Sequence, residues 1–106
     1  MIHYIENHRI NEEVLQHGDQ LVIVDFFAEW CLPCQEFSDI LTDVEKKYNG
    51  EVEFYKVNVE ESNETKMRYG IQAMPTIIFF KNGEEVERQV GMISEAALME
   101  IIEELK

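Results

Sequence analysis

The feature that most constrains this chain is a pair of cysteines directly after an apolar segment. Cys31 and Cys34 are the only cysteines, and they stand in Trp30-Cys31-Leu32-Pro33-Cys34. The preceding run, Leu21 to Phe27, is apolar apart from Asp25, which is typical of a strand covered on both faces. The spacing of apolar residues after Cys34 predicts a helix. Two thiols placed between a buried strand and a helix predict a redox couple, because a helix N-terminus favours a thiolate.

Two other interpretations of the cysteine pair are weaker. A closed zinc site needs four ligands, but the chain has no second CxxC pair, and His3, His8 and His17 lack i,i+3 or i,i+4 spacing. A purely structural disulfide is disfavoured because closing so short a loop removes little entropy from the unfolded chain. We therefore expect no metal ligands here, and we expect the histidines to lie at the surface.

The charge and length of the chain limit its partners and its location. Twenty-two acidic residues against nine basic ones give a formal net charge of −13. Such a surface repels phosphate backbones and anionic lipids, so we expect neither nucleic-acid nor membrane binding. The length fits a single domain over residues 1–106, and the sequence shows no secretory signal and no membrane-spanning apolar run. These observations predict a cytoplasmic protein. In the reducing cytoplasm, a CxxC pair is expected to alternate between dithiol and disulfide and not to form a permanent structural crosslink.

Apolar periodicity and turn signals predict the secondary structure. The apolar residues after Cys34 mark one face of a helix that Asn49-Gly50 ends. Ser62 and Ser94 are expected N-caps, and Asn82-Gly83 predicts a two-residue hairpin turn. We expect strands at 2–5, 21–27, 52–59, 76–80 and 84–90, the last at a sheet edge, and helices at 11–17, 34–48, 62–69 and 94–105.

This order of elements predicts an α/β fold. Strands that alternate with helices predict parallel βαβ units, and the last two strands predict an antiparallel hairpin. The expected architecture is one mixed sheet of about five strands with about four helices covering both faces.

Several separated motifs resemble one known family. The stretch Val24-Asp25-Phe26-Phe27-Ala28-Glu29-Trp30-Cys31-Leu32-Pro33-Cys34 resembles the active-site segment of thioredoxins. Later segments resemble that family's other landmarks at matching separations: Tyr69-Gly70-Ile71, Met74-Pro75-Thr76, Phe80-Lys81-Asn82-Gly83 and Val90-Gly91. The resemblance spans nearly the whole chain. It implies the thioredoxin fold, a cis peptide bond before Pro75, and a dithiol–disulfide activity that needs no bound cofactor.

Four positions depart from the thioredoxin pattern. Leu32 stands where thioredoxins usually have Gly, and Gln35 stands where a Lys is common. Asp39 replaces a Pro that often kinks the long helix, and Phe27 replaces a frequent Trp. These departures leave the activity class intact. They leave open the reduction potential, the identity of the reductase and the choice of target proteins.

The two cysteines are expected to have different roles. Cys31 lies outside the start of the helix, where backbone amides point and solvent has access, so we expect it to be the nucleophile. Cys34 lies one turn inside and is expected to be shielded, as suits a thiol that resolves a mixed disulfide. The alternative is a buried, inert pair.

Asp25 and Lys56 are charged residues in apolar surroundings. Asp is almost never fully buried without a partner, and burial raises the pKa of a carboxyl group. The resemblance implies that Asp25 takes or relays the proton of the second thiol. Lys56 shares strand parity with Val52 and Phe54, so it is predicted to face inward and to pair with Asp25. An exposed Asp25 at a strand end, or a Lys56 whose ammonium reaches water, are the alternatives.

The remaining candidate residues form a predicted substrate surface around the cysteines. A cis-Pro at Pro75 would leave the backbone of Met74 free to pair with an extended substrate segment, and Gly91 would let that segment approach closely. Met92 could equally be a loop residue without a role. The residues expected to contact substrate are Trp30, Leu32, Pro33, Met74, Pro75, Gly91 and Met92.

The sequence therefore predicts a thioredoxin-like protein that reduces disulfides in other proteins. Its expected partners are protein disulfide substrates and a thioredoxin-reductase-type electron donor, and it is expected to be a monomer. Two alternatives stay open. One is an oxidase or isomerase that donates disulfides, which the reduction potential would reveal. The other is an assembly module in which the cysteines are incidental.

Overall fold

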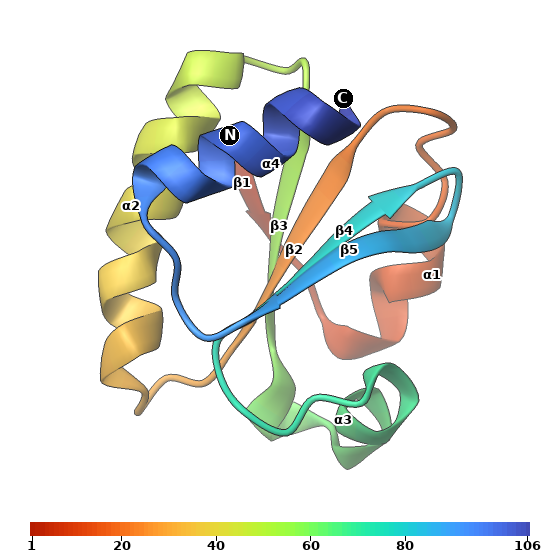
Figure 1. Ribbon diagram of the computed structural model, residues 1–106. Coiled ribbons are helices and arrows are strands. Elements are labelled where there is room, and N and C mark those ends of the chain that lie inside the picture. Colours follow the sequence, from red (N-terminus) through yellow and green to blue (C-terminus); the bar gives the residue numbers. More distant parts are fainter.

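A five-stranded mixed sheet in the order β1-β3-β2-β4-β5 forms the middle of the computed structural model, which describes residues 1–106 (Figure 1). β1 and β2 both run parallel to β3, whereas β4 runs antiparallel to β2 and β5 antiparallel to β4. The most apolar segments form the central strands, as burial on both faces requires. The strands are β1 (Ile2–Tyr4), β2 (Val22–Phe27), β3 (Glu53–Asn58), β4 (Thr76–Lys81) and β5 (Glu84–Val90).

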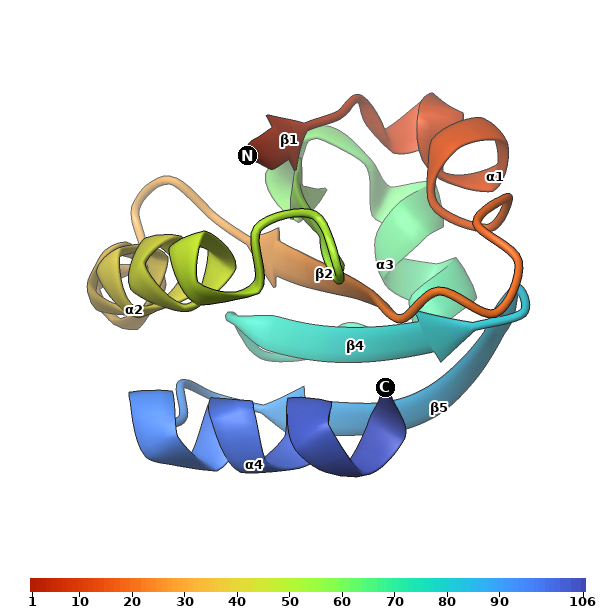
Figure 2. The same cartoon turned by 90° about the horizontal axis from the view of Figure 1, so that it is seen from above.

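Helices cover both faces of this sheet (Figure 2). α2 (Leu32–Tyr48) and α4 (Glu95–Leu105) lie on one face, where Phe37, Leu41 and Leu98 meet the alternate residues of β2, β3 and β4. The other face carries α1 (Ile10–Glu13), which follows the 3₁₀ helix η1 (Asn7–Arg9), and α3 (Asn63–Tyr69), which follows the 3₁₀ helix η2 (Val59–Glu61). None of these helices combines the length and the apolar composition needed to cross a bilayer.

The predicted helix boundaries are confirmed where capping residues define them. The hydroxyl of Ser62 accepts a hydrogen bond from the Thr65 N–H, and that of Ser94 accepts one from the Ala97 N–H, each at 3.1 Å. Asn49 ends α2 and Gly70 ends α3, both in the left-handed conformation. These caps satisfy backbone groups that a helix end otherwise leaves unpaired.

The first helix is shorter than the sequence predicted. The sequence predicted a helix at 11–17, whereas α1 spans only Ile10–Glu13. The hydroxyl of Tyr55 donates a hydrogen bond to the carbonyl oxygen of Glu13 at 3.1 Å, which is the acceptor that a continuing helix would use for His17. The ring Nε2 of His17 lies 2.8 Å from the same hydroxyl. A contact with the sheet therefore replaces the last turn of this helix.

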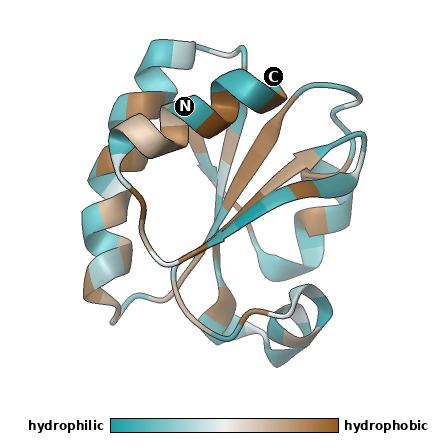
Figure 3. Cartoon of the chain, viewed as in Figure 1, coloured by the Kyte–Doolittle hydropathy of each residue, from teal (hydrophilic) through white to brown (hydrophobic).

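The direction of β4 also differs from the simplest expectation. Successive βαβ units would make β4 parallel to its neighbour, but β4 is antiparallel to β2. The hairpin of β4 and β5 is as predicted, and both Asn82 and Gly83 in its turn have positive φ. β5 lies at the sheet edge and is mostly hydrophilic, whereas the central strands are hydrophobic (Figure 3).

Candidate redox site

Cys31 and Cys34 form a disulfide at the junction of β2 and α2. Cys31 is the N-cap of α2, and its Sγ accepts a hydrogen bond from the Cys34 N–H at 3.2 Å. Pro33 occupies the first turn of the helix, where its missing N–H leaves no donor unused. The Cys31 sulfur thus lies where a helix N-terminus concentrates N–H donors and partial positive charge, which stabilises a thiolate.

Solvent exposure does not separate the two cysteines in this oxidised form. Cys31 is 3% exposed and Cys34 is 2% exposed, so the expectation that solvent reaches Cys31 is wrong for the disulfide. Both pack against Ala28, and Phe27 and Met74 flank them. The difference between the cysteines lies in their position on the helix, because only the Cys31 sulfur caps the N-terminus.

The cis peptide bond expected before Pro75 is present. The carbonyl oxygen of Met74 lies 3.4 Å from Cys31 Sγ, and neither the N–H nor the C=O of Met74 joins a backbone–backbone hydrogen bond. Pro75 itself is buried, and its carbonyl accepts a hydrogen bond from the Gly91 N–H at 2.8 Å. The structure therefore places an unpaired stretch of backbone directly beside the cysteines.

Four of the seven residues predicted to contact substrate are exposed to solvent. Trp30 is 68% exposed and Leu32 is 66% exposed on either side of Cys31, and Pro33 and Met92 are also exposed. Val90, which was not among the residues predicted to contact substrate, is a further exposed apolar residue beside Gly91. The backbone at Gly91 has a φ of +89°, which favours glycine. Lack of space is not the reason for a glycine here, because an added Cβ would meet no atom within 4 Å.

Asp25 and Lys56 lie side by side on neighbouring strands. They are paired in the register of β2 and β3, and the Lys56 Nζ lies 3.9 Å from Asp25 Oδ2. Asp25 is 0% exposed and Lys56 is 5% exposed, so Asp25 is not at an exposed strand end and Lys56 does not extend into water. Burial raises the pKa of Asp25 to about 7, although the positive charge of Lys56 lowers it.

Three side chains that were not predicted to belong to the site contact Lys56. Its ammonium donates a hydrogen bond to Ser38 Oγ at 2.9 Å, and it lies 4.7 Å from the ring centre of Phe27 and 5.3 Å from that of Tyr4. Strand parity could have indicated Phe27, which faces the same side as Asp25, and Tyr4, which pairs with Lys56. Nothing in the sequence singles out Ser38.

A pocket of about 310 Å³ opens beside Cys34 and Lys56. Three of the four positions that depart from the thioredoxin pattern, Phe27, Gln35 and Asp39, line this pocket. The Gln35 side chain also donates a hydrogen bond to the Glu29 carbonyl at 3.0 Å, which ties the start of α2 to the loop before the cysteines. Residues scattered along the sequence thus meet at one side of the redox pair.

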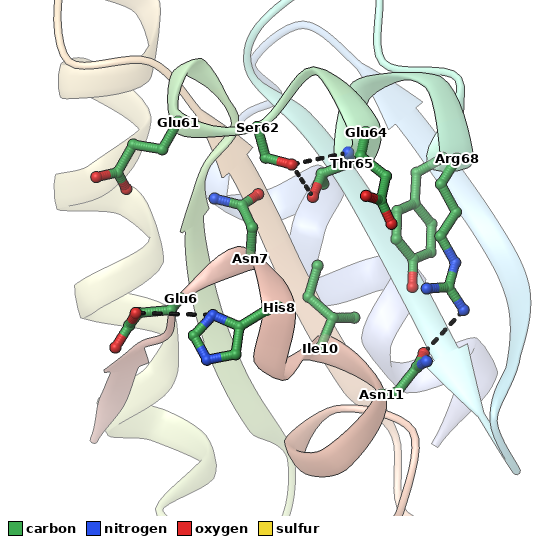
Figure 4. A pocket seen from close by; sticks show the side chains of 11 residues that line it. Glu6, Asn7, His8, Ile10, Asn11, Glu61, Ser62, Glu64, Thr65 and Arg68 are labelled. Carbon is green, nitrogen blue, oxygen red and sulfur yellow. Dashed lines mark hydrogen bonds and ion pairs between the residues drawn. The ribbon is translucent and has the colours of Figure 1, made fainter.

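A larger pocket of about 400 Å³ lies on the other face, between η1 and α1 on one side and η2 and α3 on the other (Figure 4). Arg68 of α3 donates a hydrogen bond to Asn11 Oδ1 across it at 3.0 Å. None of the predicted site residues lines this pocket, and no three His, Cys, Asp or Glu side chains in the structure are arranged to hold a metal ion.

Comparison with known proteins agrees with this geometry. The sequence profile of the family "Thioredoxin" matches residues 2–104. A thioredoxin of Rickettsia conorii is 36% identical over 102 residues, which cover 96% of each chain. A thioredoxin of Rickettsia bellii is 41% identical over 91 residues, or 86% of each chain. The chloroplastic thioredoxin M-type of Pisum sativum is 39% identical over 92 residues, which cover 87% of this chain and about half (54%) of the pea protein.

Solved structures give the same result. The X-ray structure of Fasciola hepatica thioredoxin superposes with a TM-score of 0.88 at 34% identity, and the match covers 98% of this chain and 99% of that one. The fold, the CxxC pair at the start of α2 and the relatives are consistent with one another. The chain therefore belongs to the thioredoxin family and is a thiol–disulfide oxidoreductase.

Proposed function

We propose that this protein is a dithiol reductant of disulfides in other proteins, with Cys31 as the nucleophile and Cys34 as the resolving thiol. The observation that carries this proposal is the position of Cys31 Sγ. It caps α2, accepts the Cys34 N–H, and lies 3.4 Å from the unpaired Met74 carbonyl. A thiolate there is stabilised by the helix N-terminus and lies beside backbone that a substrate segment can pair with.

The reaction proceeds in two exchanges. The Cys31 thiolate attacks one sulfur of the substrate disulfide, which forms a Cys31–substrate bond and releases the other substrate sulfur as a thiolate. Cys34 then loses its proton and attacks the Cys31 sulfur, so that the intramolecular disulfide forms and the second substrate thiol leaves. Two electrons pass to the substrate, and the protein ends oxidised.

Asp25 is the proposed acceptor of the Cys34 proton. An ordinary carboxyl group would be fully ionised at neutral pH and a weak base, whereas burial raises the pKa of Asp25 to about 7. Lys56 moderates that rise through its charge, 3.9 Å away. The surface that binds the substrate around the cysteines is formed by Trp30, Leu32, Pro33, Met74, Pro75, Gly91 and Met92.

The remaining features of the proposal concern partners and place. A thioredoxin-reductase-type enzyme re-reduces the Cys31–Cys34 disulfide, and the protein acts as a monomer formed by one domain over residues 1–106. A reducing, cytoplasmic location suits a pair that must be returned to the dithiol form. A strongly acidic surface supports the absence of nucleic-acid and membrane partners.

The activity is tested by measuring how this protein accelerates the reduction of insulin disulfides by dithiothreitol. The reduction potential of the protein is measured in parallel against a glutathione buffer. We expect turnover to depend on both cysteines and the potential to lie below that of glutathione. A potential well above glutathione would instead indicate a disulfide donor. If a Cys31→Ser, Cys34→Ser double variant kept full biological activity, the fold would be acting as an assembly module.

A further inference from the structure

Ser38 links α2 to the buried charges of the sheet. It lies one turn beyond Cys34, and its Oγ accepts a hydrogen bond from the Lys56 ammonium at 2.9 Å. No other hydrogen bond of Lys56 to a side chain occurs in the structure. The neutral hydroxyl, and not the carboxylate of Asp25, is therefore the direct partner of this buried cation.

Asp25 lies just outside hydrogen-bond distance of the same ammonium. The separation from Lys56 Nζ to Asp25 Oδ2 is 3.9 Å, and both carboxyl oxygens of Asp25 lack any hydrogen-bond partner. A direct bond would be shorter by about 1 Å and charge-assisted, and it would strongly favour the ionised carboxylate. In the observed arrangement, Asp25 does not form that bond with Lys56.

The other contacts of Lys56 hold it in the same place. The ring centres of Phe27 and Tyr4 lie 4.7 and 5.3 Å from Nζ, a distance at which a ring face attracts a cation. Ser38 on α2 and the two rings on β2 and β1 thus surround the ammonium. A cation held in this way contributes its charge to Asp25 without forming a direct ion pair.

We propose that Ser38 is a positioning residue, whose hydroxyl holds the Lys56 ammonium away from direct contact with Asp25 and so preserves the basicity of that carboxyl group. This inference rests on the proposed function for its role in catalysis, because the basicity matters only if Asp25 receives the Cys34 proton. Without the hydroxyl, the carboxylate within reach of the ammonium is that of Asp25, whose Oδ2 lies 3.9 Å away and has no hydrogen-bond partner.

Other charged groups near this contact are few. β3 contributes Lys56 itself, and β4 places the apolar Ile77 opposite Asp25. The titratable side chains that share the pocket with Lys56 are Tyr4 of β1, Glu29 of the loop before the cysteines, and Asp39 of α2, whereas Cys34 is held in the disulfide and does not titrate. Glu29 and Asp39 are exposed, so their charges are screened by water and change little when Ser38 is replaced.

The test is a direct titration of the Asp25 carboxyl group by infrared difference spectroscopy or by 13C NMR, which needs no enzymatic turnover. In Ser38→Ala we expect its midpoint to fall by about 0.5–1 pH unit, because Lys56 then bonds Asp25. Ser38→Thr, which keeps the hydroxyl, is expected to restore the original midpoint. Thr42→Ala is the matched control, since it removes another hydroxyl of α2 that bonds the Ser38 carbonyl and not Lys56.

Repeating the titration in a Lys56→Met protein tests whether Ser38 affects Asp25 through Lys56. Ser38 acts only through Lys56, so Ser38→Ala in a Lys56→Met protein should leave the Asp25 midpoint unchanged. The proposal is overturned if the midpoint in Ser38→Ala stays or rises, as it would if Lys56 turned into the adjoining pocket, or if the shift persists without Lys56. A shifted midpoint with an unchanged pH profile of mixed-disulfide resolution would uphold the positioning by Ser38 and contradict Asp25 as proton acceptor.

Discussion

The ammonium group of Lys56 lies 3.9 Å from a carboxyl oxygen of Asp25, with both side chains removed from solvent. Two opposite charges in the interior would normally form a direct, hydrogen-bonded pair. Here the ion pair is long, and the carboxyl group has no hydrogen-bond donor. Asp25 therefore keeps much of the energetic cost of burial, which is the physical reason for its raised pKa.

Replacing Asp25 by Asn should stabilise the fold, and the gain should depend on pH. Burial raises the pKa of Asp25 from 3.8 to about 7, so the folded state binds this proton more tightly than the unfolded chain does. The associated stability is fully present below about pH 4 and is lost as the pH rises through 7. Asp25→Asn removes this loss, which amounts to about 4 kcal/mol for a shift of this size.

Chemical denaturation of both oxidised proteins between pH 4 and 9 measures this difference. The advantage of Asp25→Asn should grow from pH 4 to 7 and then level off. A difference that is the same at every pH would mean that Asp25 does not titrate in this range. The same substitution should slow resolution of the mixed disulfide near neutral pH, because Cys34 loses its proton acceptor.

The two cysteine variants should differ in what they trap. Cys34→Ser leaves the nucleophile in place but removes the resolving thiol, so it should accumulate mixed disulfides with substrate, whereas Cys31→Ser should not. Alkylation of the reduced wild-type protein should label Cys31 first, because its sulfur caps α2. Intact-mass spectrometry after brief iodoacetamide treatment decides the order, and faster labelling of Cys34 would reverse the assignment.

Most of the fold could be predicted because its signals are local. Ser62 and Ser94 cap their helices, Asn49 and Gly70 end theirs, and Asn82-Gly83 forms the hairpin turn. The end of α1 could not be predicted in this way. It coincides with the hydrogen bond between the Tyr55 hydroxyl and the Glu13 carbonyl, which joins residues 42 positions apart.

The redox site was predictable to the extent that strand parity reveals it. Asp25 and Lys56 each interrupt an apolar run on the inward face, so their pairing follows once the two strands are neighbours. The contact of Ser38 with Lys56 depends instead on how α2 crosses the sheet. A serine in an amphipathic helix is unremarkable in sequence, and only the packing of α2 shows that its hydroxyl meets a buried cation.

Leu32 should contribute to substrate affinity through apolar contact. It is the first residue of α2 and is about two-thirds exposed beside Cys31. Leu32→Ala removes most of the side chain but keeps a helix-forming residue, so kcat/KM for insulin should fall about fivefold, equivalent to about 1 kcal/mol of lost burial. Leu32→Met, which keeps the apolar volume, is the control. An unchanged kcat/KM in Leu32→Ala would mean that substrate does not cover this residue.

A cation at position 35 should make the couple more oxidising. Gln35 is exposed in the first turn of α2, beside Glu29 and Glu36, and supplies no positive charge near Cys31. In Gln35→Lys, the added charge should stabilise the Cys31 thiolate, lower its pKa and so favour the reduced protein. An exposed charge near a helix start contributes about 0.3–1 kcal/mol. At about 1.4 kcal/mol per 30 mV, the reduction potential should rise by about 6–20 mV.

Equilibration with glutathione at low and high salt measures this shift. Gln35→Met is the matched control, because it loses the hydrogen bond to the Glu29 carbonyl without adding charge. The difference between Gln35→Lys and Gln35→Met should shrink as salt screens the exposed charge. A potential that stays constant or falls in Gln35→Lys at low salt would refute the electrostatic explanation, and equal shifts in both variants would assign the effect to the lost hydrogen bond.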